Sequence, residues 1–235
     1  MAAAPAESAP AGQPRAPKAA ISGPKRVYLV AYNALSAVLW SVVLVRTVEA
    51  LYTGGPKAVY PAVGEWTKWT QTLAALEIVH SLLGVVRAPL STTAMQVASR
   101  FALVWGAVHF YPATALSPAY SSMLLAWSVT EVVRYLFFAL SLSGWEPAAL
   151  RWQRYSGFYV LYPVGIASEL WLIFVAGCEA RYADQTDAFI LSTVVMSAYP
   201  FGAPTLFKHM RAQRRKVLGG GGAPAVVAVD EKKTQ

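Results

Sequence analysis

The sequence contains one cysteine, few histidines and few charged residues. Cys178 is the only cysteine among 235 residues, which excludes an intramolecular disulfide and a multi-cysteine metal site. The three histidines are scattered and form no HExxH-like motif, so we expect no metal site. Charged residues make up 14% of the chain, whereas soluble domains carry about 25%. These absences argue against a disulfide-stabilised, metal-dependent or freely soluble protein.

Apolar residues are abundant instead. They make up 56% of the chain, and the mean hydropathy is +0.41. A water-soluble protein of this size could not bury so much apolar surface in one core. The net charge of +8 would fit a nucleic-acid partner, but the basic residues lie at the ends of apolar segments. That distribution is typical of a membrane protein, so we expect membrane lipid around the chain and no nucleic acid.

The two ends of the chain have the composition of tails. Residues 1–24 are rich in alanine and proline and predict a disordered N-terminal tail without a removable signal peptide. Residues 217–235 include four consecutive glycines and predict a flexible C-terminal tail. This tail ends in Lys232-Lys233-Thr234-Gln235, which resembles a dilysine retrieval signal of the endoplasmic reticulum. Two lysines on a solvated tail are the alternative interpretation.

Between the tails the sequence predicts an all-α, polytopic membrane domain over residues 25–216. A helix that crosses the hydrocarbon core needs about 20 mostly apolar residues, and backbone groups in lipid must be satisfied within the helix. Six segments meet or approach this requirement: 28–46, 70–86, 98–116, 121–142, 155–176 and 187–207. The second segment is the weakest, because it contains Glu77 and His80.

The distribution of basic residues supports six spans. Of the 20 lysines and arginines, 15 fall on the side that holds both tails and the loops after the second and fourth spans. Four fall on the other side, and Arg134 lies within a span. Because cytosolic segments carry an excess of lysine and arginine, we expect both termini to be cytosolic.

Ionisable residues within membrane spans are costly and are candidates for function. Glu77 and His80 are three residues apart, as are Glu131 and Arg134, so each pair lies on one helix face. Tyr135 adds a hydroxyl beside the second pair. Both pairs could instead serve only to hold neighbouring helices together.

Glu169 has no opposite charge within a helical turn. Tyr162 lies seven residues earlier, so the two side chains project from nearly the same face, about 10 Å apart along the helix axis. Such a separation leaves room for a bound substrate between a phenol and a carboxyl group. The pair could perform acid–base chemistry, or each side chain could merely bond to a neighbouring helix.

Several separated segments carry a resemblance to a known family. Leu76–His80, Gly84–Arg87 and Gln96–Arg100 resemble its first motif, Ala126–Tyr135 its second, and Arg154–Glu169 its third. The family is that of the 3-hydroxyacyl-CoA dehydratases, earlier described as protein tyrosine phosphatase-like. A phosphatase activity is not expected, because Cys178 lacks the arginine that such enzymes carry five residues after the nucleophile.

The resemblance implies a six-helix enzyme of the endoplasmic reticulum membrane that needs no cofactor. It would dehydrate (3R)-3-hydroxyacyl-CoA to trans-2-enoyl-CoA in the third step of very-long-chain fatty acid elongation. The catalytic tyrosine and glutamate of the family fall on Tyr162 and Glu169. Expected partners are the acyl-CoA substrate and the other enzymes of the elongation cycle, namely the condensing enzyme and the reductases.

Two further groups of side chains complete the expected site. Five basic residues near the cytosolic mouth are candidates for binding the phosphates of CoA, and the alternative is that they only set the topology: Arg87, Arg100, Arg151, Arg154 and Lys208. A second group is expected to orient the catalytic pair: Glu77, His80, Glu131, Arg134 and Tyr135. The competing functions are a scaffold for elongation enzymes and a proton-coupled transporter or channel, whose relay would be Glu77, His80, Glu131 and Glu169.

Overall fold

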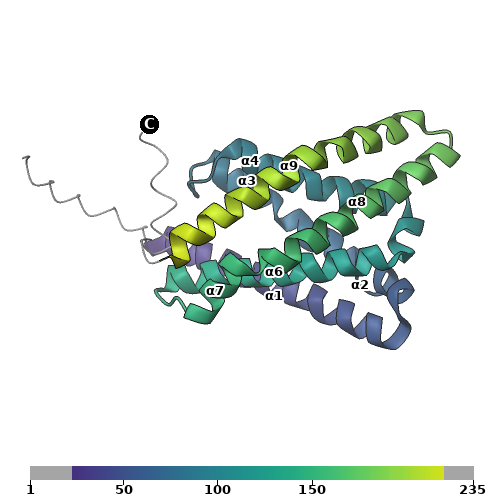
Figure 1. Ribbon diagram of the computed structural model, residues 1–235. Helices are drawn as coiled ribbons and strands as arrows, with labels where there is room; N and C mark the ends of the chain where they lie inside the picture. Colours follow the sequence, from purple (N-terminus) through teal and green to yellow (C-terminus); the bar gives the residue numbers. More distant parts are fainter. Residues whose placement is uncertain (1–22, 220–235) are drawn as a thin grey trace, which may run out of the picture.

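The computed structural model describes residues 23–219, which fold into a bundle of helices without strands over that range (Figure 1). The expectation of an all-α protein is therefore confirmed. The predicted tails at 1–24 and 217–235 lie almost entirely outside the described residues. At their inner edges, helix α1 already begins at Gly23 and helix α9 continues to Leu218.

Within residues 23–219, four helices are long and apolar enough to cross a membrane. They coincide with four of the six predicted spans, so the apolar composition does form membrane-length helices. They are α1 (Gly23–Gly54), α6 (Pro118–Ser143), α8 (Phe158–Tyr182) and α9 (Thr186–Leu218).

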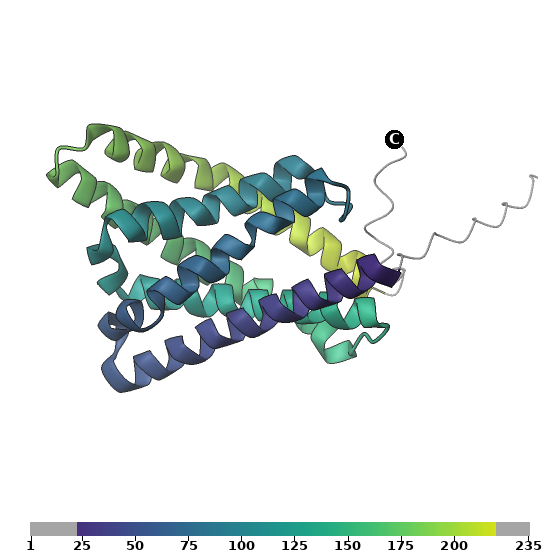
Figure 2. The ribbon, with the colours of Figure 1, turned by 180° about the vertical axis from the view of Figure 1, so that it is seen from behind.

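The other two predicted spans fall on interrupted helices. Segment 70–86 covers the end of α2 (Pro56–Leu73) and all of α3 (Ala75–Leu82). Segment 98–116 begins in α4 (Leu90–Phe101) and continues through the π-helix η1 (Ala102–Ala107), α5 (Val108–Phe110) and the 3-10 helix η2 (Pro112–Leu116). Both composite helices lie alongside the long ones in the bundle (Figure 2). The count of six spans is thus not confirmed by uninterrupted helices, of which four qualify.

Local sequence explains where the long helices begin and end. The Ser117 hydroxyl accepts a hydrogen bond from the Ala119 amide, and Pro118 occupies the first turn of α6, where its missing N–H costs nothing. Gly144, with φ 91°, ends the same helix in a left-handed conformation that glycine adopts without strain. The Trp145 amide then bonds back to the Leu140 carbonyl and closes the cap.

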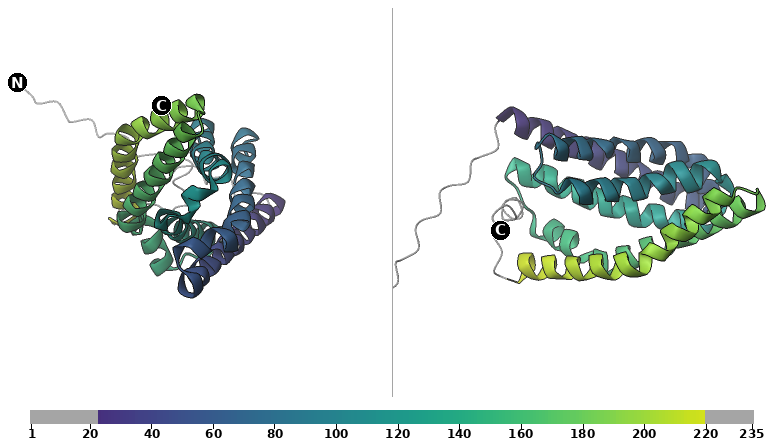
Figure 3. Two further views of the ribbon diagram at one scale, coloured as in Figure 1. Left: turned by 90° about the vertical axis from the view of Figure 1, so that its right-hand side faces the viewer. Right: turned by 90° about the horizontal axis from the view of Figure 1, so that it is seen from above.

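Helix α6 lies at the centre of the packing. It packs against α1 on one side and against α8 on the other, while α9 packs on α8 and on α7 (Ala148–Ser156). Figure 3 shows α8 and α9 together forming one side of the bundle. Buried residues of α1 recur every three or four positions, as in Leu29, Tyr32, Ser36, Trp40 and Val43, so one stripe of that helix faces the core.

Both described ends of the chain lie at the same end of the bundle. The first turn of α1, the last turns of α9 and helix α7 all lie at this end (Figure 1), and the right-hand view of Figure 3 shows α1 and α9 on opposite sides of it. The Arg214 Nε on α9 donates to the Ser156 hydroxyl at the end of α7, 3.0 Å away. At the opposite end, the Tyr111 hydroxyl donates to the Gln185 side chain in the α8–α9 turn.

Candidate active site

The side chains of Tyr162 and Glu169 both point from α8 towards α9. The Tyr162 hydroxyl donates to the Ala203 carbonyl at 3.1 Å, and its ring lies against Phe207. One Glu169 carboxylate oxygen accepts from the Tyr199 hydroxyl at 2.9 Å. The seven-residue spacing therefore places the phenol and the carboxylate on one helix face, as the sequence predicts.

The part of α8 between these two side chains contains a glycine. Gly165 occupies the intervening turn, and a methyl group added there would lie 3.8 Å from the Ala126 Cβ and 3.9 Å from the Glu169 carboxylate. Within the described residues, no hydrogen bond joins Tyr162 to Glu169 directly. A reactive group could therefore contact both side chains without first breaking a bond between them.

Glu169 is anchored from a third helix as well. Its other carboxylate oxygen accepts from the Trp127 indole N–H on α6, 2.8 Å away. Trp127 is buried, whereas Glu169 is half-buried. The carboxylate is thus held between α6 and α9 by two neutral donors, and no cationic side chain is bonded to it among residues 23–219.

A second polar cluster lies deeper between α3, α4 and α6. The Arg134 guanidinium donates to Glu131 at 2.7 Å and to both oxygens of Glu77 at 2.8 and 3.1 Å. The Tyr135 hydroxyl donates to Glu77 at 2.5 Å, and Arg100 pairs with Glu131. Two carboxylates and two guanidinium groups therefore cancel each other's charge within one bonded network.

Of the two pairs that share a helix face, one is bonded within its helix and the other is not. Glu131 and Arg134 form the expected ion pair across one turn. Glu77 instead bonds to Arg134 and Tyr135 on another helix, and His80 shares a hydrogen bond of 2.6 Å with the Tyr28 hydroxyl on α1. The reason is packing: α3 meets α6 and α1, and those contacts replace a local Glu77–His80 bond.

The five basic residues considered for CoA phosphates fall into three groups. Arg100 belongs to the buried cluster, since it pairs with Glu131 and lies 4.7 Å over the Trp127 ring. Arg87, in the loop after α3, and Lys208, on α9, are exposed. Arg151 and Arg154 lie on α7, and the Nε atom of each is buried without a hydrogen-bond partner among the described residues. The structure therefore does not bring all five to one place.

Two site residues were missed by the sequence reasoning. Trp127 lies within a segment that resembles the family but was not considered for a role, and Tyr199 lies in the last predicted span. A signal for Tyr199 did exist: Tyr199, Ala203 and Phe207 recur every four residues, which puts them on one face of a helix. That face contacts both Tyr162 and Glu169.

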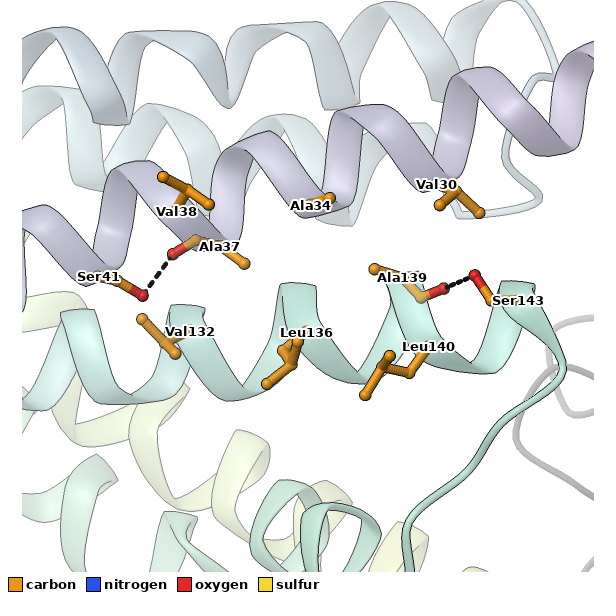
Figure 4. A pocket seen from close by; sticks show the side chains of 10 residues that line it. All are labelled: Val30, Ala34, Ala37, Val38, Ser41, Val132, Leu136, Ala139, Leu140 and Ser143. Atoms are coloured by element: carbon orange, nitrogen blue, oxygen red, sulfur yellow. Dashed lines mark hydrogen bonds between the residues drawn. The ribbon is translucent and has the colours of Figure 1, made fainter.

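An apolar groove elsewhere in the bundle has no such chemistry. A groove of about 370 Å³ lies between α1 and α6, and Figure 4 shows aliphatic side chains along it. Its two hydroxyl groups, on Ser41 and Ser143, each bond to a carbonyl of their own helix at 2.8 Å. No ionisable side chain lines the groove, so acid–base chemistry points to the Tyr162–Glu169 face instead.

Comparison with known proteins gives a consistent result. Residues 71–220 match the family model described as protein tyrosine phosphatase-like protein, PTPLA. A probable very-long-chain (3R)-3-hydroxyacyl-CoA dehydratase of Schizosaccharomyces pombe is 42% identical over 196 residues, covering 81% of this chain and 92% of that protein. Very-long-chain (3R)-3-hydroxyacyl-CoA dehydratase 2 of Homo sapiens is 33% identical, covering 81% of this chain and 80% of that protein. No solved structure gives a significant match.

Proposed function

Because the chain belongs to the PTPLA family of very-long-chain (3R)-3-hydroxyacyl-CoA dehydratases, we propose that it dehydrates (3R)-3-hydroxyacyl-CoA to trans-2-enoyl-CoA and water. This reaction is the third step of very-long-chain fatty acid elongation, and the enzyme is a hydro-lyase. The observation that carries the proposal is the pair formed by Tyr162 and Glu169 on one face of α8, with small residues between them.

The reaction needs one base and one acid. The thioester acidifies the Cα–H bond, and Glu169 takes that proton as the carbon–oxygen bond at Cβ breaks. Tyr162 gives its proton to the departing hydroxyl, which leaves as water. The bonding supports these roles: the Glu169 oxygens accept hydrogen bonds, as an ionised base does, and the Tyr162 hydroxyl donates, as an acid does. The residues need no redox cofactor or metal for these steps.

The proposed topology has six membrane crossings with both termini in the cytosol. Four uninterrupted helices and two interrupted ones, α2–α3 and α4–η1–α5, would make these crossings. An even number is supported by the position of the two described ends at the same end of the bundle (Figure 1). The excess of basic residues on that side supports its assignment to the cytosol.

The CoA end of the substrate would remain in cytosolic water while the acyl chain lies among the helices. Arg151 and Arg154 on α7 are the best placed of the basic candidates, because α7 lies at the proposed cytosolic end (Figure 1). Both side chains are half-buried, so the other N–H groups of each guanidinium could donate to a phosphate oxygen. Arg87 and Lys208 are further candidates, whereas Arg100 is already paired with Glu131.

The buried cluster would support the catalytic pair rather than react. We place Glu77, Glu131, Arg134 and Tyr135 in this supporting role, with Arg100 added to the group. His80 joins it through the rings of Tyr32 and Tyr28. The dehydratase domain would then comprise residues 25–216 in the endoplasmic reticulum membrane, where the condensing enzyme and the reductases of elongation would be its neighbours.

A direct assay tests the reaction. The purified, detergent-solubilised protein is incubated with a (3R)-3-hydroxyacyl-CoA, and the trans-2-enoyl-CoA product is identified by mass and ultraviolet absorbance. We expect turnover by the wild type and a loss of about 100-fold or more in Tyr162→Phe, because removing a general acid costs 10²–10⁴ in rate. Wild-type protein without turnover would contradict the function, and full activity of Tyr162→Phe would contradict the role of the phenol.

The alternative function, a proton-coupled transporter, requires a different arrangement of ionisable groups. A proton relay requires ionisable groups that exchange protons along a path through the membrane. Here, four charged groups within the bundle form ion pairs with one another: Glu77, Arg100, Glu131 and Arg134. Reconstituted vesicles that show dehydratase turnover without proton flux would separate the two functions.

A further inference from the structure

Glu169 differs from the other membrane-embedded glutamates in the type of its partners. Glu77 and Glu131 bond to arginines, which neutralise them. Glu169 bonds instead to the Trp127 indole at 2.8 Å and to the Tyr199 hydroxyl at 2.9 Å. An indole N–H can only donate, so the oxygen that it contacts must accept. The two donors thus hold the carboxylate in an accepting state without cancelling its charge.

The Trp127 side chain is itself held in place by burial and by Arg100. It is 3% exposed, and the Arg100 guanidinium lies 4.7 Å from the ring centroid. Arg100 is fixed in turn by its ion pair with Glu131. A cation over an aromatic face is attracted by the ring, most strongly for tryptophan. The Trp127 ring therefore connects the buried charge cluster to Glu169.

Tyr199 provides the opposite anchor, from α9. Its neighbour on the same face, Ala203, offers the carbonyl that accepts from Tyr162 at 3.1 Å. One helix face therefore contacts both members of the catalytic pair, the carboxylate through a donor and the phenol through an acceptor. The Tyr162 proton points at this carbonyl, and a substrate hydroxyl could replace the carbonyl as its acceptor.

We propose that Trp127 and Tyr199 are the positioning residues of the dehydration, which hold the Glu169 carboxylate from two sides so that it is oriented for proton abstraction. This inference rests on the proposed function. The two neutral donors fix the rotation of the carboxylate and stabilise its negative charge, as hydrogen bonds to an ionised group do. Because neither donor is a cation, the carboxylate stays free to take a proton from carbon.

The test uses the full-length protein and Cα-deuterated substrate. Trp127→Phe and Tyr199→Phe each delete one donor and keep an aromatic ring. Since a hydrogen bond to a charged group is worth about one to two powers of ten in rate, we expect kcat to fall about 10- to 100-fold in each variant, with KM within about twofold of the wild type. The deuterium isotope effect on kcat should rise, because proton abstraction becomes slower relative to product release.

Matched controls make the same substitutions away from the site. Trp171→Phe and Tyr182→Phe change exposed residues of α8 and should leave kcat and the isotope effect unchanged. A double variant adds a check: in a Glu169→Gln background, Tyr199→Phe should lower the residual activity by less than about twofold, because residues that act as a unit are not additive.

The outcomes separate this inference from the function on which it rests. Wild-type turnover with wild-type kcat in both Phe variants would overturn the positioning role and leave the dehydratase function standing. A loss of kcat accompanied by a lower melting temperature and an unchanged isotope effect would assign both residues to structure and also overturn it. Absence of turnover in the wild type would contradict the proposed function itself.

Discussion

Acidic side chains have different bonding partners in the half of the bundle around α6 and in the half formed by α8 and α9. Around α6, Glu131 is 2% exposed and bonds to two arginines. On α8, Glu169 is half-buried and bonds to two neutral donors. The packing differs in parallel: α6 carries many buried residues, whereas α9 carries none in the range that the structure describes.

This difference shows which carboxylate can react. A carboxylate that is neutralised by two guanidinium groups gives up its charge only at a large cost, because the arginines would be left unpaired. A carboxylate that is held by neutral donors can accept a proton without leaving an opposite charge unpaired. The same residue type therefore stabilises one half of the molecule and is available for chemistry in the other.

The strongest way to test this contrast is to make the same substitution in both halves. Glu169→Gln removes the base, so we expect kcat to fall about 10²- to 10⁴-fold, the range typical for general acid–base catalysis. The melting temperature should change little, because the Trp127 indole can still donate to the amide oxygen and the Tyr199 hydroxyl can accept from the amide NH2 group. Dehydratase kinetics and thermal unfolding in detergent provide the two measurements.

The control for this variant is Glu179→Gln, an exposed position near the end of α8. It should match the wild type in both measurements. A Glu169→Gln protein with wild-type turnover would show that the base lies elsewhere and that the contrast between the two halves carries no catalytic meaning.

Glu131→Gln should have the opposite phenotype. Removing one partner of a buried ion pair costs about 3–5 kcal/mol, since the remaining charges are left uncompensated. Arg100 would lose its ion-pair partner, and Arg134 would keep only Glu77. We expect a large fall in melting temperature, measured by thermal unfolding of the detergent-solubilised protein.

Asp184→Asn is the matched control for charge loss. Its side chain is 95% exposed and lies 3.9 Å from the Arg181 guanidinium, so its removal should cost less than about 0.5 kcal/mol. If Glu131→Gln and Asp184→Asn were equally stable, the α6 cluster would not be the structural element described above.

Much of this arrangement could be predicted because it depends on short-range periodicity. The seven-residue spacing placed Tyr162 and Glu169 on one face, and the three-residue spacing paired Glu131 with Arg134. Four of the six predicted spans are uninterrupted helices of membrane length. Each of these features is encoded within a few turns of one helix.

What could not be predicted depends on contacts between helices. Arg100 was grouped with the CoA candidates, yet its partner Glu131 is 31 residues away on another helix. The Trp127–Glu169 bond joins residues 42 apart, and no local pattern specifies such a contact. Hydropathy also does not predict where the second and third predicted spans are interrupted, as at the π-helix Ala102–Ala107.

Two glycines of α8 offer a finer comparison within the α8–α9 half. A methyl group added at Gly177 would collide with the Ser192 side chain on α9, whereas one added at Gly165 meets only ordinary contacts. We expect Gly177→Ala to lower the free energy of unfolding by about 1–3 kcal/mol through overpacking. Gly165→Ala should not lower it, because alanine favours the helix over glycine by about 1 kcal/mol.

Thermal unfolding of the two variants side by side measures this difference. Equal stability would mean that α9 can move away from α8 at no cost near Gly177. In that case the α8–α9 pairing that presents Tyr199 to Glu169 would be looser than the contacts indicate.

The smallest expected effect concerns the exposed basic residues. Lys208 is exposed on α9 and has no hydrogen bond or ion pair among the residues that the structure describes, so Lys208→Ala should leave stability unchanged. If it contacts a CoA phosphate, KM should rise about 3- to 10-fold with kcat within about twofold, since a lost ground-state contact lowers binding without touching the chemical step. Lys57→Ala, at the opposite end of the bundle in α2, should leave KM unchanged. Equal KM values for both variants and the wild type would restrict Lys208 to setting topology and would leave Arg87, Arg151 and Arg154 as the candidates for the phosphates.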